Sequence, residues 1–217
     1  MPGLGHERRL QGAGFHHILA MDEAGRGAWA GPLCVGAVCL PPGRAGLRQS
    51  LADVRDSKVM SPGQREAARV VIMSVAWTWG LGQASNTEID EGGIEKATTL
   101  AMRRALDDAC RRRPGFEPDC LLLDALVWPE ALSRYPQVTM IDGDARSLSI
   151  AAASVLAKTW RDEQMRTLAQ DFPAYGFGRH KGYGTATHRA ALDAHGPSPL
   201  HRRSYQPLRE MPNGQQP

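Results

Sequence analysis

The chain has 217 residues, of which 42% are hydrophobic and 23% are charged, a balance typical of a globular protein that buries one sizeable core. No stretch approaches the roughly 20 apolar residues of a membrane-spanning helix, and residues 1–14 lack the apolar core of a signal peptide. The composition therefore argues against a membrane or secreted protein and favours a cytoplasmic one, in which the four cysteines stay reduced.

The first half of the chain predicts a hairpin followed by a third strand. Residues 15–21 and 32–40 are apolar runs typical of buried strands, and the glycines between them favour an antiparallel pair. Ser61 has the pattern of an N-cap for a helix over 62–73, because a proline follows it directly. Aromatic and β-branched residues at 75–80 predict the third strand.

The second half alternates strands and helices. After a turn at 86–90 we expect helices over 94–113, 147–172 and 185–195, a strand over 120–124, and a fifth strand that lies with its exit over 137–144. The pattern predicts an α/β fold with a mixed sheet covered by helices and a helical C-terminal extension. We divide the chain into a disordered lead-in, a globular domain, a C-terminal helical and loop segment, and a disordered tail: residues 1–14, 15–172, 173–210 and 211–217.

Acidic residues follow three of the predicted strands. The first strand ends in Asp22 and Glu23, another ends in Asp124, and a third leads into Asp142 and Asp144. Strand ends are where open α/β sheets place ligands, and an all-oxygen cluster suits Mg²⁺ or Mn²⁺ better than zinc. Such a cluster can hold two ions that activate water and stabilise the leaving oxygen of a phosphodiester. The alternative is that these aspartates form turns and are satisfied by backbone amides.

The turn after the first strand contains Gly25, Arg26 and Gly27. Glycines let a backbone approach a ligand closely, and an arginine offers a planar fork for phosphate. The simpler interpretation is a glycine-rich turn between two strands, capped by the carboxylates.

Positive charge is concentrated near the C-terminus. From Ala145 onward there are 10 Lys and Arg against 5 Asp and Glu, whereas residues 1–144 have 16 against 18. A basic segment beside an acidic site suits a polyanion held near a cation site. Solvated arginines on helix faces are the alternative, and charge alone does not decide between the two.

Motifs along most of the chain resemble the bacterial ribonuclease HII family, a branch of the type 2 ribonucleases H. The resemblance rests on segments in family order over residues 15–208: Met21–Gly27 with Ala30–Pro32, Asp56–Lys58, Ile89–Asp90, Gly93–Ile94, Ala97–Thr98, Leu123–Asp124, Gly143–Asp144, Ser149–Lys158, His180–Thr185, Gly196–Pro199 and His201–Ser204. It implies an RNase H-like mixed five-stranded sheet, with residues 15–172 as the catalytic domain and 173–210 as a substrate-binding segment.

The resemblance also implies an activity. The family cuts RNA–DNA hybrids, and duplex DNA with embedded ribonucleotides, on the 5′ side of the ribonucleotide, and it leaves 3′-hydroxyl and 5′-phosphate ends. The family requires Mg²⁺ or Mn²⁺ and takes part in removing ribonucleotides from DNA. We expect the partner to be nucleic acid, two ions in the working complex, and a monomer.

Site residues carry over by motif position. Asp22, Glu23, Asp124 and Asp144 match the acidic quartet; the segment Gly25–Gly27 matches the reader of the ribose 2′-hydroxyl; Tyr183 matches the tyrosine that packs on the sugar after the RNA-to-DNA junction. Only the 2′-hydroxyl distinguishes RNA from DNA at a given site, and a backbone that approaches it needs glycine. Further candidates for phosphate contact are Lys58, Ser154, Lys158, His180 and Lys181, although His180 also suits a structural role.

Three positions depart from the family pattern: Ala125 replaces a usual Gly, Asp142 a usual Lys and Ala145 a usual Ser. Asp142 is an extra acid two residues from Asp144, where it either perturbs metal affinity or faces solvent. The runner-up within the superfamily is ribonuclease HIII, which usually has Gly-Lys-Gly and a substantial N-terminal domain. Other classes are a non-catalytic hybrid-binding protein and a metal-dependent phosphatase.

Overall fold

Two apolar runs joined by a glycine-containing turn form the hairpin at the centre of the protein. In the computed structural model, which describes residues 1–131 and 134–211, β1 (Ile18–Ala24) pairs antiparallel with β2 (Leu33–Cys39). All of β2 and all of β1 except Glu23 are buried, as expected for strands covered on both faces. The predicted antiparallel hairpin is confirmed.

The hairpin forms part of a mixed five-stranded sheet in the order β3-β2-β1-β4-β5. β3 (Thr78–Ala84) extends it antiparallel beside β2, whereas β4 (Cys120–Asp124) and β5 (Gln137–Met140) lie parallel to β1. The carboxyl ends of β1, β4 and β5 therefore meet at one edge of the sheet, where the sequence predicts the acidic site.

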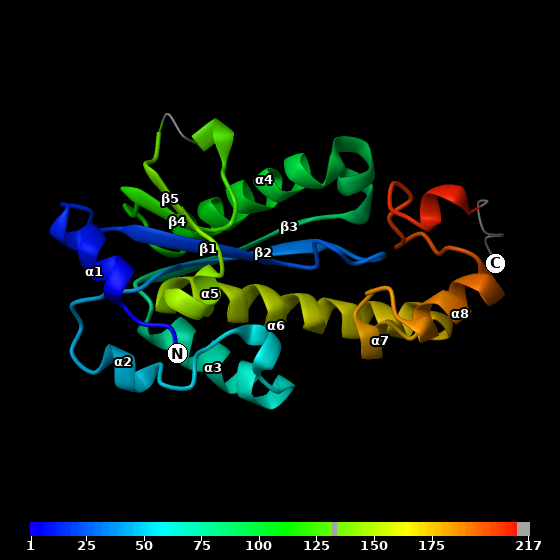
Figure 1. Ribbon diagram of the computed structural model, residues 1–217, viewed down its shortest axis with the longest axis horizontal. Helices are drawn as coiled ribbons and strands as arrows, with labels where there is room; N and C mark the ends of the chain where they lie inside the picture. The colour runs from blue at the N-terminus through cyan, green and yellow to red at the C-terminus, as the bar shows by residue number, and fades with distance from the viewer. Residues whose placement is uncertain (132–133, 212–217) are drawn as a thin grey trace.

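Long helices cover both faces of this sheet (Figure 1). α4 (Asn86–Arg112) packs against β3 and β2 on one face, and α6 (Leu148–Asp171) packs against β1 and β2 on the other. Gly36 makes a close approach possible, because a Cβ there would overlap the Ala153 carbonyl of α6. The remaining helical elements are α1 (Gly5–Gly12), α2 (Leu47–Ser50), η1 (Ser57–Val59), α3 (Pro62–Val75), η2 (Pro129–Ala131), α5 (Gly143–Arg146), η3 (Pro173–Tyr175), α7 (Phe177–His180), α8 (Ala186–His195) and η4 (Leu208–Glu210).

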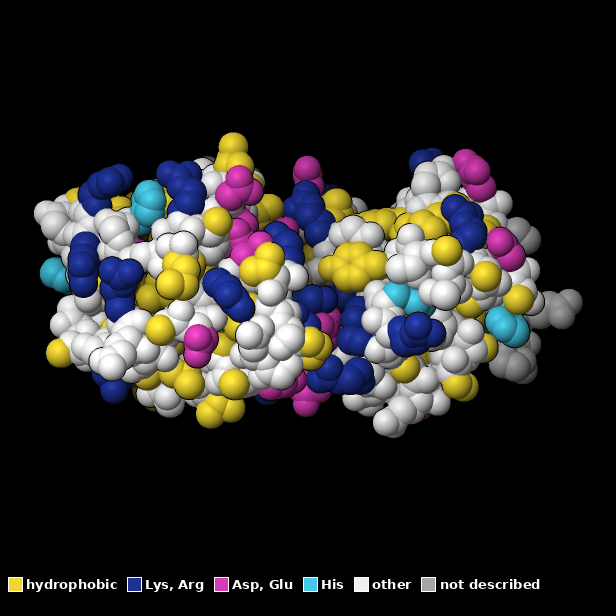
Figure 2. Space-filling model, turned by 60° about the horizontal axis from the view of Figure 1, so that its bottom comes forward, with side chains coloured by type: hydrophobic (Ala, Val, Ile, Leu, Met, Phe, Trp, Pro, Cys, Tyr) yellow, Lys and Arg dark blue, Asp and Glu magenta, His cyan; other side chains and the backbone are white. Residues whose placement is uncertain are grey.

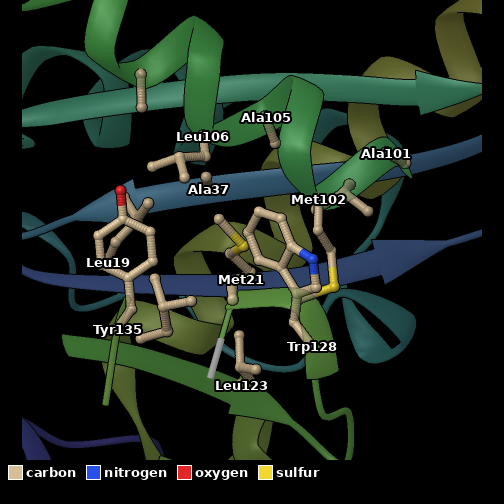
Figure 3. Packing of buried hydrophobic residues seen from close by; sticks show 14 of the residues in the cluster. Leu19, Met21, Ala37, Ala101, Met102, Ala105, Leu106, Leu123, Trp128 and Tyr135 are labelled. Atoms are coloured by element: carbon tan, nitrogen blue, oxygen red, sulfur yellow. The ribbon is translucent and has the colours of Figure 1, made fainter. Parts of the chain in front are cut away.

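The core between the sheet and α4 is closed by the segment that follows β4. Trp128 and Tyr135 come from this segment and lie between the sheet and the helix, against Leu19, Met21 and Leu123 (Figure 3). Buried aromatic rings contribute large apolar areas, so this segment is fixed close to the end of β4.

The C-terminal elements pack at the far end of α6, away from β5 (Figure 1). A chain of hydrogen bonds holds them: the Ser198 N–H donates to His201 Nδ1 (2.8 Å), the two Nε2 atoms of His201 and His188 lie 2.9 Å apart, and His188 Nδ1 lies 3.0 Å from the Tyr183 carbonyl. This order assigns one proton to each ring, so both imidazoles are neutral. Among the described residues no helix is long and apolar enough to cross a membrane.

Three expectations about elements are wrong. The lead-in is helical over Gly5–Gly12 instead of disordered, because buried Glu7 binds the distant Ser147 and Ser149. Residues 86–90 are the first turns of α4, capped by Ser85 and Glu88, with the kink at Gly93 where the sequence predicted the helix to begin. The third strand is Thr78–Ala84 instead of 75–80, because α3 continues to Val75. Of the predicted tail, residues 212–217 lie outside the described residues.

Candidate active site

Three carboxylates converge at the edge of the sheet. Asp22 comes from β1, Asp124 ends β4 and Asp144 lies on α5, and one oxygen atom of each lies within 4.8 Å of the others. Backbone amides orient two of them: the Glu23 N–H donates to Asp22 Oδ1 and the Gly143 N–H donates to Asp124 Oδ1, both at 2.8 Å. The second bond also ties β4 to the turn that carries Asp144.

Asp144 reaches the cluster from a helical turn and not from a strand. After β5 ends, Asp142 takes a left-handed conformation with φ 53°, which directs the chain into α5. Asp142 is exposed and is not among the carboxylates of the cluster, whereas Asp144 is only 4% exposed. The extra acid at 142 therefore adds charge near the site without joining it.

Burial and mutual repulsion make the charged form of these carboxylates costly. Burial raises the pKa of Asp22 well above its ordinary value, and the charges of Glu23 and Asp124 raise it further, against a hydrogen bond from Ser154. Burial likewise raises the Asp124 pKa, opposed by the Gly143 N–H and reinforced by the charge of Asp144. Carboxylates gathered in this way attract cations.

Glu23 is not among the three carboxylates whose oxygen atoms lie within 4.8 Å of one another, although its charge raises the pKa of Asp22. Successive side chains of a strand face opposite sides of the sheet, and Glu23 follows Leu19 and Met21 on the side of α4. Burial raises its pKa, while the charge of Arg26 lowers it. Its Oε2 atom is buried and has no hydrogen-bond partner in the described part of the chain. The structure thus brings together three of the four acids.

The donor set fits a hard divalent cation. Asp22, Asp124 and Asp144 offer only oxygen atoms at close range, which suits Mg²⁺ or Mn²⁺, and zinc sites usually include nitrogen or sulfur. The buried Glu23 Oε2 has no hydrogen-bond partner among the described residues, so it is a further oxygen available beside the cluster. The residues present therefore fit the ion that the resemblance implies.

Polar side chains from two further elements line the cluster. Lys58 Nζ lies 3.4 Å from Asp144 Oδ2, although the lysine side chain is 76% exposed. Burial lowers the Lys58 pKa, but the charges of Asp144 and Asp56 outweigh it, so the pKa lies above its ordinary value. Ser154 of α6 hydrogen-bonds Asp22, and its Oγ lies 3.0 Å from Ser57 Oγ.

The glycine turn lies against the loop that carries Tyr183. The Trp29 N–H donates to the Gly182 carbonyl at 2.8 Å, and Arg161 bridges the two segments through the carbonyls of Ala30 (3.2 Å) and Lys181 (2.9 Å). The residues that the resemblance assigns to the 2′-hydroxyl and to the neighbouring sugar therefore sit on two joined loops.

The weaker phosphate candidates have partners within the protein. Lys158 pairs with Asp162 at 2.7 Å and lies 5.6 Å from the centre of the Tyr183 ring. His180 Nε2 lies 2.7 Å from the Tyr175 carbonyl and its Nδ1 accepts from the Gly182 N–H, which agrees with a structural role. Lys181 Nζ donates to the Gly178 carbonyl, and burial lowers its pKa.

Figure 2, seen from the side of α6, shows Lys and Arg side chains gathered in the middle of the molecule beside the C-terminal segment, with some Asp and Glu side chains among them. On the other side, a hollow of about 410 Å³ adjoins the site and is lined by Arg26, Lys96, Thr98, Ala125 and Val127, among others. Both features are suited to a nucleic-acid backbone beside the carboxylates.

Sequence reasoning missed three residues beneath the glycine turn: Arg161, Arg202 and Tyr205. Both arginines are fully buried, a state that is rare for arginine and that no local pattern predicts. The only available signal was the position of Arg202 within the His201–Ser204 motif, which the sequence analysis used for the resemblance alone.

Comparisons with known proteins agree with this geometry. A family model described as Ribonuclease HII matches residues 19–208. Ribonuclease HII of Dehalococcoides mccartyi is 44% identical over 211 residues, which cover 97% of this chain and 95% of that protein. Among solved structures, ribonuclease H2 from Pyrococcus horikoshii OT3 has a TM-score of 0.70 at 24% identity, covering 89% of this chain and 95% of that one.

A second solved structure, Bst-RNase HIII in complex with Mn²⁺, has a TM-score of 0.67 at 17% identity and covers 89% of this chain and 68% of that one. At these identities the two structures establish the shared fold. They confirm the predicted mixed five-stranded sheet with flanking helices and a helical C-terminal part.

Proposed function

The chain belongs to the ribonuclease HII family, and from this premise we propose that it is a metal-dependent endoribonuclease acting on RNA–DNA hybrids and on duplex DNA with embedded ribonucleotides. We further propose that it hydrolyses the phosphodiester on the 5′ side of the ribonucleotide, leaves 3′-hydroxyl and 5′-phosphate ends, and takes part in removing ribonucleotides from DNA.

The observation that carries the proposal is the convergence of Asp22, Asp124 and Asp144 within 4.8 Å at one edge of the sheet. We propose that these three residues, with Glu23 at the rim, hold Mg²⁺ or Mn²⁺, with two ions in the working complex. The bound ions would supply activation of water and stabilisation of the leaving oxygen. The Mn²⁺ complex of a structural neighbour supports this assignment.

Selectivity for the ribonucleotide is assigned to the two joined loops. We propose that the Gly25–Gly27 backbone binds the 2′-hydroxyl, and the support is that Gly27 is exposed and its N–H donates to no acceptor within the described residues. We assign Tyr183 to the sugar on the DNA side, where its ring would crowd a second hydroxyl. Lys58 and Lys181 are proposed phosphate contacts, because each carries a cation beside the site or the tyrosine loop.

The test is cleavage of a DNA duplex that carries one ribonucleotide, beside an all-DNA duplex of the same sequence, with Mg²⁺ or Mn²⁺. We expect one cut, 5′ to the ribonucleotide, and none in the control. Equal cutting of the two duplexes would contradict the proposal, and so would the absence of any cut by a folded sample. A long RNA–DNA hybrid assayed in parallel measures the preference between the two substrate classes.

A further inference from the structure

Two buried guanidinium groups lie under the turn between β1 and β2. Arg161 and Arg202 are both 0% exposed, and neither forms a salt bridge within residues 1–131 and 134–211. A buried charge without a counter-ion is expensive unless its donors are fully used. These two arginines must therefore be satisfied by other acceptors.

The acceptors are backbone carbonyls of the turn and its neighbours. Arg161 Nε donates to Pro32 (2.8 Å), and its two other nitrogens donate to Lys181 and Ala30, as described above. Arg202 donates from Nη2 (2.9 Å) and Nε (3.1 Å) to the Gly31 carbonyl, and from Nη1 (2.9 Å) to the Arg26 carbonyl. The turn is thus held from below by charge-assisted hydrogen bonds, which are stronger than neutral ones.

The Arg26 carbonyl is held by two different side chains. It accepts from Arg202 Nη1 at 2.9 Å and also from the Tyr205 hydroxyl at 2.8 Å. A peptide unit is planar, so fixing the Arg26 carbonyl also fixes the Gly27 N–H on the opposite edge of the same plane. That N–H lies on an exposed residue and is unpaired in the described part of the chain.

We infer that Tyr205 and Arg202 are positioning residues that fix the Arg26–Gly27 peptide plane and thereby determine how strongly the protein prefers a ribonucleotide to a deoxyribonucleotide. The ligand of this plane is a sugar hydroxyl, and the inference rests on the proposed function. A donor that is held in place before binding loses little freedom when the hydroxyl arrives, so it discriminates more sharply than a mobile one.

The chain offers a matched pair of tyrosines for the test. Tyr205→Phe removes the hydroxyl that binds the Arg26 carbonyl, and Tyr175→Phe removes a hydroxyl that binds the Gly196 carbonyl, also at 2.8 Å, and not the Arg26–Gly27 peptide. For wild type and both variants, the measurements are the KM for the single-ribonucleotide duplex, the inhibition constant Ki of the all-DNA duplex, and the melting temperature.

We expect Tyr205→Phe to raise KM for the ribonucleotide duplex roughly three- to tenfold, the loss typical of one hydrogen bond, with Ki for the all-DNA duplex unchanged. Tyr175→Phe should leave both constants at wild-type values, with a similar change in melting temperature. Arg202→Lys keeps the positive charge but loses the planar guanidinium group that binds the Gly31 and Arg26 carbonyls together. This variant should change the KM-to-Ki ratio in the same direction as Tyr205→Phe.

An unchanged KM-to-Ki ratio in Tyr205→Phe would overturn the inference, and so would an equal change in Tyr175→Phe. A parallel rise of KM and Ki would also overturn it, because that result would indicate a general loss of affinity. If wild type itself leaves the single-ribonucleotide duplex uncut, it is the proposed function that fails. The two failures are therefore distinguishable.

Discussion

At the scale of single residues, the clustered carboxylates of the site lower the stability of the folded protein. Asp22 is 7% exposed and shares its surroundings with Asp124 and Asp144, and no cation among the described residues neutralises it directly. Its raised pKa means that the folded protein binds a proton at Asp22 more tightly than the unfolded chain does. Side chains at functional sites often lower stability in this way.

We expect Asp22→Asn to raise the melting temperature in the absence of divalent cations while it abolishes activity. Asparagine keeps the acceptor for the Glu23 N–H and removes the charge, so stability should increase by about 1 kcal/mol. Cleavage should fall at least about 100-fold, because a lost metal ligand forfeits several kcal/mol. Calorimetry with and without Mn²⁺ checks both points, since Mn²⁺ should stabilise wild type more than the variant.

Asp142→Asn is the matched control for that change. It removes an acidic charge two positions from Asp144, but Asp142 is exposed and outside the cluster. Its effect on stability should stay within about 0.5 kcal/mol. A variant at Asp22 that melts below wild type without metal would contradict the account of the site.

The two glycines of the turn should respond differently to alanine. Gly25 has φ +94° and a Cβ there would overlap Arg161 Nε, whereas a Cβ at Gly27 meets nothing within 4 Å. We expect Gly25→Ala to cost roughly 2–4 kcal/mol from backbone strain and overpacking, and Gly27→Ala to cost less than about 1 kcal/mol. Denaturant unfolding measures the difference, and equal losses would refute this explanation.

At the scale of elements, α1 shows how a distant contact orders a segment that local pattern leaves undefined. One oxygen of Glu7 accepts from Ser147 Oγ (2.6 Å) and from the Ser149 N–H (3.0 Å), at the start of α6. A carboxylate at a helix N-terminus is favoured by the dipole and by the free N–H groups there. Since Asp144 precedes this point by only three residues, α1 also supports the site.

We expect Glu7→Ala to lower the free energy of unfolding by about 1–3 kcal/mol, because it leaves buried donors without an acceptor. Glu7→Gln retains one acceptor oxygen and should recover part of the loss. Arg9→Ala on the same helix is exposed and should change stability by less than about 0.5 kcal/mol. Urea titrations of the three variants test this, and similar values for Glu7→Ala and Arg9→Ala would exclude an ordering role for Glu7.

At the scale of the whole molecule, two neutral histidines join the C-terminal segment into one unit. Burial lowers the pKa of His188 and of His201 to about 4, and each ring carries one proton in the hydrogen-bond chain that ends at the Tyr183 carbonyl. A second proton on either ring would break that chain. Acid should therefore loosen the part of the molecule that carries Tyr183.

The sign of the pH dependence follows from linkage. Between the ordinary histidine value of about 6.5 and the folded value of about 4, the unfolded chain binds protons that the folded protein does not. Stability should be full above pH 6.5 and decline below it, by at most about 1.4 kcal/mol per pH unit for each histidine. The raised pKa values of Asp22, Glu23 and Asp124 act in the opposite direction.

Guanidinium titrations at several pH values between 4.5 and 7.5, without divalent cations, measure this dependence. The Asp22→Asn variant is the better background, because it lacks a strong opposing carboxylate. His195→Gln changes an exposed histidine and should keep the same slope. A free energy of unfolding that is constant over this range in the Asp22→Asn background would be incompatible with neutral buried histidines.

The sequence by itself predicts most strands and the position of the acidic site, because a hydrophobic run and the acid that ends it are adjacent in the chain. The hairpin, the later strands and α6 appear where the patterns predict them, and Asp22, Asp124 and Asp144 meet because β1, β4 and β5 are neighbours. The family motifs, which are also sequence patterns, indicate the ribonuclease HII family before any coordinates are considered.

The tertiary structure alone decided which distant groups satisfy one another. It showed which three carboxylates lie within 4.8 Å of one another, ordered α1 through Glu7, and placed Arg202 and Tyr205 on the Arg26 carbonyl, 176 and 179 positions away. Every residue has a backbone carbonyl, so a residue of any type can accept such a hydrogen bond. The sequence therefore does not reveal which residue is the acceptor. Only the folded chain shows which carbonyl a buried donor reaches.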